Sequence, residues 1–168
     1  MLGWPAVWPG PGPEVDGVEI KMVLFLPRDA ASVPVTRQVL DGCLQTLGVT
    51  ADTRNDIALA LSEACANVIQ HAGPGDEYEV LARAQNGRCV IEVVNTGSGD
   101  GGLVVIPSAG PVPPTEEHGR GLKIIDAVVD NVRLTGNDGH GTTVHFEKTL
   151  DWVPGAPGQL LFSGDSDG

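Results

Sequence analysis

The chain has 168 residues, 41% of them hydrophobic, a composition that suits one globular domain with a packed core. Twenty-two acidic residues against ten basic ones give a formal net charge of −12, which repels nucleic acid phosphates, so we expect no direct binding of DNA or RNA. No apolar run approaches the roughly 20 residues that span a bilayer, and the N-terminal stretch lacks the basic and apolar blocks of a secretory signal. We therefore expect a cytoplasmic protein that does not bind membranes.

Residues 1–17 are rich in proline and glycine, which predicts a disordered leader. Residues 18–27, VEIKMVLFLP, alternate and then run apolar, which predicts a strand. From Asp29 to Leu47, apolar residues recur at helical spacing, and Gly48 stands where a helix C-cap belongs. The apolar positions of this predicted helix are Val35, Val39, Leu40, Leu44 and Leu47.

A second helix is predicted over residues 51–71, with Asp52 or Thr53 as its N-cap. Two strands follow at 77–85 and 88–95. The Asn-Gly pair between them is typical of a β-hairpin.

The second half of the chain begins with a long connection over residues 96–121. This connection is rich in glycine and proline, and it is too long for an idle turn in a compact domain. A helix over 121–132 and two strands over 132–136 and 142–150 are predicted after it.

This order of elements predicts an α+β fold. We expect residues 18–150 to form a two-layer sandwich, with helices on one face of a mixed, mostly antiparallel sheet. Residues 151–168 are again loop-like, and we expect them to form a flexible C-terminal tail.

The second predicted helix carries three polar residues at four-residue spacing, Glu63, Asn67 and His71. At about 100° per residue they form a stripe directly beside the apolar stripe of Ile57, Leu61, Ala64 and Val68. Polar groups at this boundary are partly removed from water, which costs free energy unless a partner engages them. Spacing alone also fits three residues at the rim of the protein that meet water or a loop.

Glycines cluster at two expected element ends. The motif NTGSG puts Asn95, Gly97 and Gly99 at the end of a strand, and HGRGLKII puts Gly119 and Gly121 at the start of a helix. Glycines let backbone N–H groups approach an anion closely, and a helix N-terminus adds partial positive charge. An acidic chain would need such local help to bind phosphate. Each pattern alone is weak, because turns use glycine freely.

The blocks together, in this order, resemble the ATP-binding domain shared by gyrase, MutL and histidine kinases. Within that superfamily, LALSEACANVIQHA and GRGLKIIDAVVD are most similar to the bacterial anti-sigma-factor serine kinases, and the resemblance covers roughly residues 18–148. It implies a Bergerat-type ATP-binding fold, with ATP and Mg²⁺ as cofactors.

The resemblance also implies a role for each matching residue. Glu63 would act as the general base on the attacking hydroxyl, and Asn67 would coordinate the Mg²⁺ of the bound nucleotide. Residues 98–118 would form a lid over it. The remaining nucleotide-binding positions would be Asn95, Gly97, Gly99, His118, Gly119, Arg120, Gly121, Leu122 and either Thr142 or Thr143. For His71 and Lys123 a direct role stays open, because they equally suit a helix end and a solvent-facing position.

One position departs from the family pattern. Asn95 stands where the family usually has an aspartate that accepts a hydrogen bond from the adenine amino group. An amide oxygen still accepts that bond but without charge assistance, a loss on the order of 1 kcal/mol, or about tenfold in affinity.

The function implied by the resemblance is that of an anti-sigma factor and serine/threonine kinase. Such a protein binds a sigma factor, phosphorylates a STAS-type antagonist protein on serine, and forms a homodimer, expected here through the first strand and helix. The alternative is a partner-switching module that binds nucleotide weakly and does not catalyse. A sensor histidine kinase fits less well, because we find no segment for a dimerising hairpin with a phospho-accepting histidine.

Overall fold

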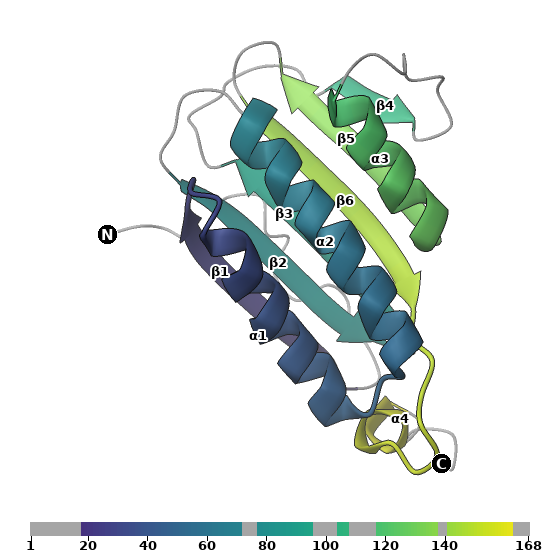
Figure 1. The fold of residues 1–168 in the computed structure, drawn as a ribbon. Coiled ribbons are helices and arrows are strands. Elements are labelled where there is room, and N and C mark those ends of the chain that lie inside the picture. Colours follow the sequence, from purple (N-terminus) through teal and green to yellow (C-terminus); the bar gives the residue numbers. More distant parts are fainter. Residues whose placement is uncertain (1–17, 72–76, 96–103, 108–116, 138–140, 163–168) are drawn as a thin grey trace.

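The protein forms a layer of helices on one face of a six-stranded sheet (Figure 1). The computed structural model describes residues 18–71, 77–95, 104–107, 117–137 and 141–162. The strands are β1 (Ile20–Pro27), β2 (Glu77–Gln85), β3 (Arg88–Asn95), β4 (Val104–Pro107), β5 (Asn131–Asn137) and β6 (Gly141–Thr149). The helices are α1 (Ser32–Leu47), α2 (Ala51–His71), α3 (Glu117–Val128) and α4 (Pro157–Phe162).

The sheet order is β1-β2-β3-β6-β5-β4, and the pairings between the described strands are all antiparallel. The predicted α+β sandwich is confirmed, but the sheet, which we expected to be mixed, is antiparallel at each of these pairings. The predicted hairpin is confirmed as well, because Asn86 and Gly87 both have positive φ, 50° and 73°, as a tight two-residue turn requires. None of the helices in the described part of the chain is both long and apolar enough to cross a membrane.

The boundaries predicted for the second half of the chain need correction. The helix predicted over 121–132 begins earlier, at Glu117, and ends at Val128, and β5 starts at Asn131. The expected long connection also contains β4, which pairs with β5. A four-residue strand within a glycine- and proline-rich segment is too short to show a recognisable alternation of apolar and polar residues. Its pairing with β5 can be seen only in the folded sheet.

The apolar face of α1 was predicted only in part. Leu40, Leu44 and Leu47 are buried, but Val35 and Val39 are 54% and 40% exposed. The buried positions in the first half of the helix are polar instead. They are Ser32 and Thr36, whose hydroxyls donate to the backbone carbonyls of Asp29 and Ser32. A buried hydroxyl that is hydrogen-bonded costs little, so these residues can face the core.

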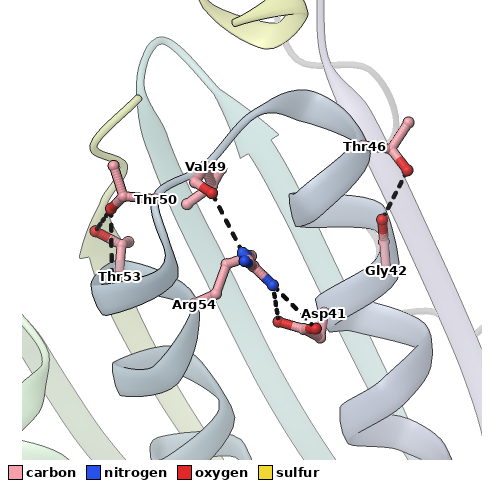
Figure 2. A network of polar contacts seen from close by, with 7 residues as sticks. All are labelled: Asp41, Gly42, Thr46, Val49, Thr50, Thr53 and Arg54. Atoms are coloured by element: carbon pink, nitrogen blue, oxygen red, sulfur yellow. Dashed lines mark hydrogen bonds and ion pairs between the residues drawn. The ribbon is translucent and has the colours of Figure 1, made fainter. Parts of the chain in front are cut away.

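Helices α1 and α2 are joined through Arg54, as Figure 2 shows. Its Nη1 donates to both carboxylate oxygens of Asp41 on α1, at 3.0 and 3.2 Å, and its Nε donates to the carbonyl oxygen of Val49 at 3.2 Å. The N-cap of α2 is Thr50, not Asp52 or Thr53, because its Oγ1 accepts from the backbone N–H of Thr53. These bonds fix the angle at which α2 enters the helix layer.

Residues after β6 pack against the α1–α2 junction. The carbonyl oxygens of Asp151 and Gly48 accept from the backbone N–H groups of Thr50 and Val153. Ala156 is fully buried, and Gly158 lies so close to the Trp152 ring that a Cβ there would be 2.4 Å from it. The expected flexible tail therefore makes fixed contacts with the domain as far as α4.

Gly48 carries the first testable consequence of this packing. Its φ is 89°, and a Cβ at this position would lie 2.5 Å from the Cβ of Ala156. We expect Gly48→Ala to lower the free energy of unfolding by about 2–4 kcal/mol, from the left-handed backbone and the clash together. Gly155→Ala is the control, since Gly155 has a φ of 74° but a Cβ added there would have no neighbouring atom within 4 Å. Equal losses in urea denaturation of the two variants would contradict the contact with Ala156.

The sheet face turned away from the helices carries an ionic cluster around His145. Its Nδ1 lies 3.1 Å from Glu92 and its Nε2 lies 3.2 Å from Glu147, while Arg133 is the neighbouring residue on β5. The hydrogen bond to Glu92 raises the pKa of His145, against the effect of burial, and the same bond lowers the pKa of Glu92.

This cluster predicts a pH dependence of stability. Because the pKa of His145 is raised on folding, the charged ring stabilises the fold fully below its ordinary pKa of about 6.5, and the contribution is lost as the pH rises through the folded-state pKa. We expect the stability advantage of the wild type over His145→Gln to shrink by about 0.5–1 kcal/mol between about pH 6 and about pH 9. Urea denaturation across this range measures it, and a difference that stays constant would contradict a charged His145.

Candidate functional site

Helix α2 lies between α1 and α3 in the helix layer and positions the first candidate residues (Figure 1). Its predicted apolar stripe is confirmed, because Ile57, Leu61, Ala64 and Val68 are at most 1% exposed. Glu63 is half-buried and Asn67 is 6% exposed, so the polar stripe lies at the boundary of the core. The side chain of His71 lies outside the described part of the structure.

Asn67 has a polar atom without a partner. Its Oδ1 is buried and accepts no hydrogen bond from any residue that the structure describes. An unsatisfied buried acceptor typically costs about 1–3 kcal/mol, so a natural protein keeps one chiefly where something else binds it. The alternative that Asn67 simply meets water at the rim does not agree with this burial.

Helix α3 brings the second motif to the first. A Cβ built on Gly121 would lie 3.2 Å from Oε2 of Glu63, tighter than ordinary van der Waals contact. Gly121 therefore lets α3 approach the Glu63 carboxylate, and it joins the glycine-rich motif of α3 to the polar stripe of α2. Leu122, the next residue, is half-buried against the core.

Asn95 lies at the end of β3, next to Tyr78 on β2, and is 7% exposed. In the burial alternation of β3 it shares the inner face with Val93, towards the helices. Thr143 pairs with Val94, and both occupy the opposite face of the sheet. Of the two candidate threonines, Thr143 is therefore on the side away from α2.

Several candidate positions cannot be compared with the structure. Gly97, Gly99 and most of the expected lid lie outside the described residues. The backbone of residues 118–120 is helical within α3, but the side chains of His118 and Arg120, like that of Thr142, are outside the described part. Lys123 is exposed.

The residues present fit Mg²⁺ bound together with a polyphosphate. Magnesium prefers oxygen ligands and commonly takes only one or two from the protein, with the rest from phosphates and water. The buried Oδ1 of Asn67 is an oxygen of this type. The described residues contain no group of three or more His, Cys, Asp or Glu side chains that could hold a metal ion.

Sequence analysis missed a buried polar cluster that connects β2 to α1 and α2 near the candidate site. The hydroxyl of Tyr78, which is fully buried, lies 2.5 Å from Ser32 Oγ at the start of α1. Because Ser32 Oγ donates to Asp29, Tyr78 is the donor in their bond. Tyr78 also bonds Cys65 on α2, and burial raises the pKa of this thiol to about 12, so it stays protonated. Tyr78 thereby links α1 and α2 to the strand position beside Asn95.

Two cations hold the ends of α2 and α3 in place. Lys148 of β6 donates to the carbonyl oxygen of Val128 at the C-terminus of α3, at 2.7 Å, and pairs with Asp56 on α2 at 3.2 Å. Arg28 donates to the carbonyl oxygen of Ile69 in the last turns of α2 at 2.7 Å. Both cations satisfy orphan carbonyls near helix C-termini. Neither position has a periodicity or spacing from which this role could be read.

Comparison with known proteins finds a matching domain family and several relatives. The profile of the Histidine kinase-like ATPase domain family matches residues 26–148. Serine-protein kinase RsbW of Bacillus velezensis is 30% identical over 146 residues, which cover 82% of this chain and 88% of that protein. Serine-protein kinase RsbW of Bacillus mycoides is 28% identical over 127 residues, or 71% of this chain and 79% of that protein.

A solved structure shows the same fold. The crystal structure of the RsbU and RsbW domains of Rv1364c from Mycobacterium tuberculosis superposes with a TM-score of 0.58 at 20% sequence identity. The match covers 78% of this chain but only 32% of that longer chain. At this identity the likeness concerns the fold alone.

Proposed function

The chain belongs to the histidine kinase-like ATPase domain family, and from this premise we propose that it is an anti-sigma factor with serine/threonine protein kinase activity. The observation that carries the proposal is the meeting of Glu63 with Gly121, one helical turn from the buried, unpartnered oxygen of Asn67. A base and a metal ligand on one rigid helix, facing a glycine-rich helix start, meet the requirements of phosphoryl transfer from ATP.

In the proposed reaction each residue has one task. Glu63 would accept the proton of the attacking serine hydroxyl, and Asn67 Oδ1 would hold a Mg²⁺ ion, which would neutralise charge on the phosphates. The start of α3, with His118, Gly119, Arg120, Gly121 and Leu122, and the loop glycines Gly97 and Gly99 bind the phosphates. Asn95 accepts from the adenine, with Thr142 preferred over Thr143 beside it because Thr143 is on the outer face.

We propose the partners from the similarity to the RsbW kinases. They are a sigma factor, which the protein binds in the cytoplasm, and a STAS-type antagonist, which it phosphorylates on serine. Partner switching between the two would regulate transcription, and the protein would act as a homodimer. Support comes from a similarity that runs through most of this chain and most of its relatives.

The test begins with affinity capture from lysate of the native cell, with and without MgATP, to obtain the partners. The captured antagonist is then incubated with the purified protein and radiolabelled MgATP. We expect phosphoserine with the wild type and none with Glu63→Ala. Equal labelling by both proteins would remove Glu63 from the mechanism.

Asn95 favours a second candidate function, that of a partner-binding module without catalysis. In such a module nucleotide binds weakly or has only a structural role. The amide replaces a charged acceptor at a site that is 7% exposed, where charge assistance matters most. Full capture of the sigma factor by Glu63→Ala, combined with no phosphate transfer by the wild type, would support this module over the kinase.

The same residue gives a direct prediction about nucleotide affinity. Asn95→Asp adds a charge-assisted hydrogen bond to the adenine amino group, so we expect ATP to bind about tenfold more tightly. Aspartate cannot donate to a guanine carbonyl, so the preference for ATP over GTP should rise as well. Calorimetric titration of both nucleotides measures the change. Unchanged affinities would show that residue 95 does not contact the base.

A further inference from the structure

One position on the helix-facing side of β6 holds a charged residue. The inward residues Val144 and Phe146 are fully buried in the core. The next inward position is Lys148, whose side chain is 18% exposed and whose cross-strand neighbour, Cys89, is buried as well. A charge in such a position costs free energy unless it is paired, and an apolar residue of similar size is often at least as stabilising. Stability alone therefore does not explain a lysine here.

Lys148 joins the two helices that form the candidate site. Its Nζ donates to the carbonyl oxygen of Val128, the last residue of α3, at 2.7 Å, and lies 3.2 Å from Oδ2 of Asp56 on α2. We call these two contacts the Lys148 bridge. The end of α3 is also held to β6, because the backbone N–H of Asp130 donates to the carbonyl oxygen of Glu147 at 2.9 Å. That bond does not reach α2, whereas the Lys148 bridge binds both helices.

The Lys148 bridge and the contact between Glu63 and Gly121 lie on the same pair of helices. Asp56 precedes Glu63 by seven residues, and Gly121 precedes Val128 by seven. The two helices therefore run antiparallel and in register, with Asp56 beside the end of α3 and Glu63 beside its start (Figure 1). Seven residues are about two helical turns, or about 10 Å. Because a helix is stiff over this length, a change in the tilt or axial position of α3 at the bridge also moves Gly121.

The distance between Glu63 and the start of α3 has little tolerance. A Cβ built on Gly121 would lie 3.2 Å from Oε2 of Glu63 and 4.0 Å from its Cβ. In the proposed reaction the start of α3 binds the phosphates, and Glu63 takes the proton of the attacking hydroxyl. This distance therefore determines how far the base lies from the bond that forms. A displacement of about 1 Å at a reacting centre can lower the rate by about a hundredfold.

We propose that Lys148 is a positioning residue, which sets the spacing between Glu63 and the start of α3 by holding α2 and α3 together two turns away. For its effect on rate the inference rests on the proposed phosphate transfer, but the spacing itself is a property of the free protein. The described contacts of Lys148 are with the two helices, so it acts on the transfer through Glu63.

The spacing can be measured without nucleotide through an engineered disulfide. Glu63→Cys combined with Gly121→Cys would place two Cβ atoms 4.0 Å apart, which is within the range of disulfide geometry. Cys43 is exposed and is replaced through Cys43→Ser, whereas Cys65 and Cys89 are buried and can stay. The equilibrium of this disulfide with glutathione then measures how well the two positions are aligned.

Lys148→Met keeps an apolar stem of similar length and removes the ammonium group. We expect it to lower the equilibrium constant of the disulfide by about tenfold. In the protein without engineered cysteines, we expect kcat for phosphate transfer to fall by about 10–100-fold, while KM for ATP changes much less. A side chain that only stabilised the fold would lower the melting temperature and leave both quantities unchanged.

Lys21→Met is the matched control. Lys21 lies on β1, at the opposite edge of the sheet from β4, and it also pairs with a carboxylate, that of Glu19 at 3.5 Å. This variant should change neither the disulfide equilibrium nor the transfer. Circular dichroism verifies that the variants are folded. Asp56→Ala covers the case in which Lys148→Met does not fold, because Asp56 is 39% exposed and its truncation removes only the α2 half of the bridge. We expect the same two changes from it, each of them smaller.

An unchanged disulfide equilibrium in folded Lys148→Met would overturn the inference. If that variant is unfolded, an unchanged equilibrium in Asp56→Ala would overturn it instead. An equal fall in Lys21→Met would overturn it too, because the effect would then come from the loss of any paired lysine. If the wild type transfers no phosphate, the kinase proposal fails, while a lower disulfide equilibrium constant in Lys148→Met still supports the role of Lys148 in spacing the helices.

Discussion

Glu63→Gln is expected to lower the rate of phosphate transfer by about 10²–10⁴-fold while nucleotide affinity changes little. Glutamine has the shape of glutamate, so the close approach of Gly121 to position 63 is preserved. The glutamine side chain cannot take up the proton of the attacking hydroxyl, so the substitution removes only the role of general base. The measurement is the initial rate of phosphoserine formation on the captured antagonist, together with calorimetric titration of MgATP.

Asp52→Asn is the matched control for this variant. It removes one carboxylate from the same helix, at an exposed position in the first turn that lies several turns from the glycine-rich start of α3. We expect normal transfer from it. A Glu63→Gln protein with wild-type transfer would leave the helix with no base at position 63, and the roles of both polar residues would need to be reassigned.

Helix α2 shows how far a sequence pattern reaches. Its apolar stripe and its polar stripe are both local features of a helix with 3.6 residues per turn, so spacing alone located Asn67 at the core boundary. The orphaned oxygen of Asn67 was not visible in the sequence, because an atom lacks a partner only with respect to the rest of the fold.

Helix α1 shows where such a pattern fails. Its spacing allowed two apolar faces, one with Val35 and Val39 and one with Leu40 and Leu44. The second is the inner one, and it also carries Ser32, whose hydroxyl contacts that of Tyr78, a residue 46 positions away. A partner so far away in the sequence satisfies a buried polar position, which local periodicity cannot anticipate.

The prediction of the candidate site depended more on the order of the motifs along the chain than on the spacing of residues within them. No local rule brings Gly121 to Glu63, and the sequence suggested it only through the succession of motifs that resembles a known family. The supports of the site had no pattern at all. Lys148, for example, follows an ordinary strand alternation, yet it binds both α2 and the end of α3.

Asn67→Ala is the second variant with a large expected effect. It should change the stability of the free protein little and abolish the stabilisation by MgATP. Truncation of a buried side chain usually costs about 2–5 kcal/mol. Asn67→Ala also removes an unsatisfied buried acceptor, which relieves about 1–3 kcal/mol, so we expect the free protein to lose only about 1–2 kcal/mol. The stabilisation that MgATP gives should instead be lost. At a ligand concentration of 100 times the dissociation constant, that stabilisation is about 2.7 kcal/mol in the wild type.

The comparison is made by urea denaturation with and without MgATP, and Asn55→Ala serves as the control. Asn55 is an exposed asparagine on the same helix, so its truncation should alter neither the free protein nor the gain from nucleotide. A metal role predicts more than a loss of binding. If Asn67 acts through Mg²⁺, the variant should bind ATP in EDTA as well as the wild type does, and the two proteins should differ only when magnesium is present. An equal loss in both conditions would mean that Asn67 contacts the nucleotide directly, and the ligand assigned to its buried oxygen would change from the metal to a phosphate or ribose group.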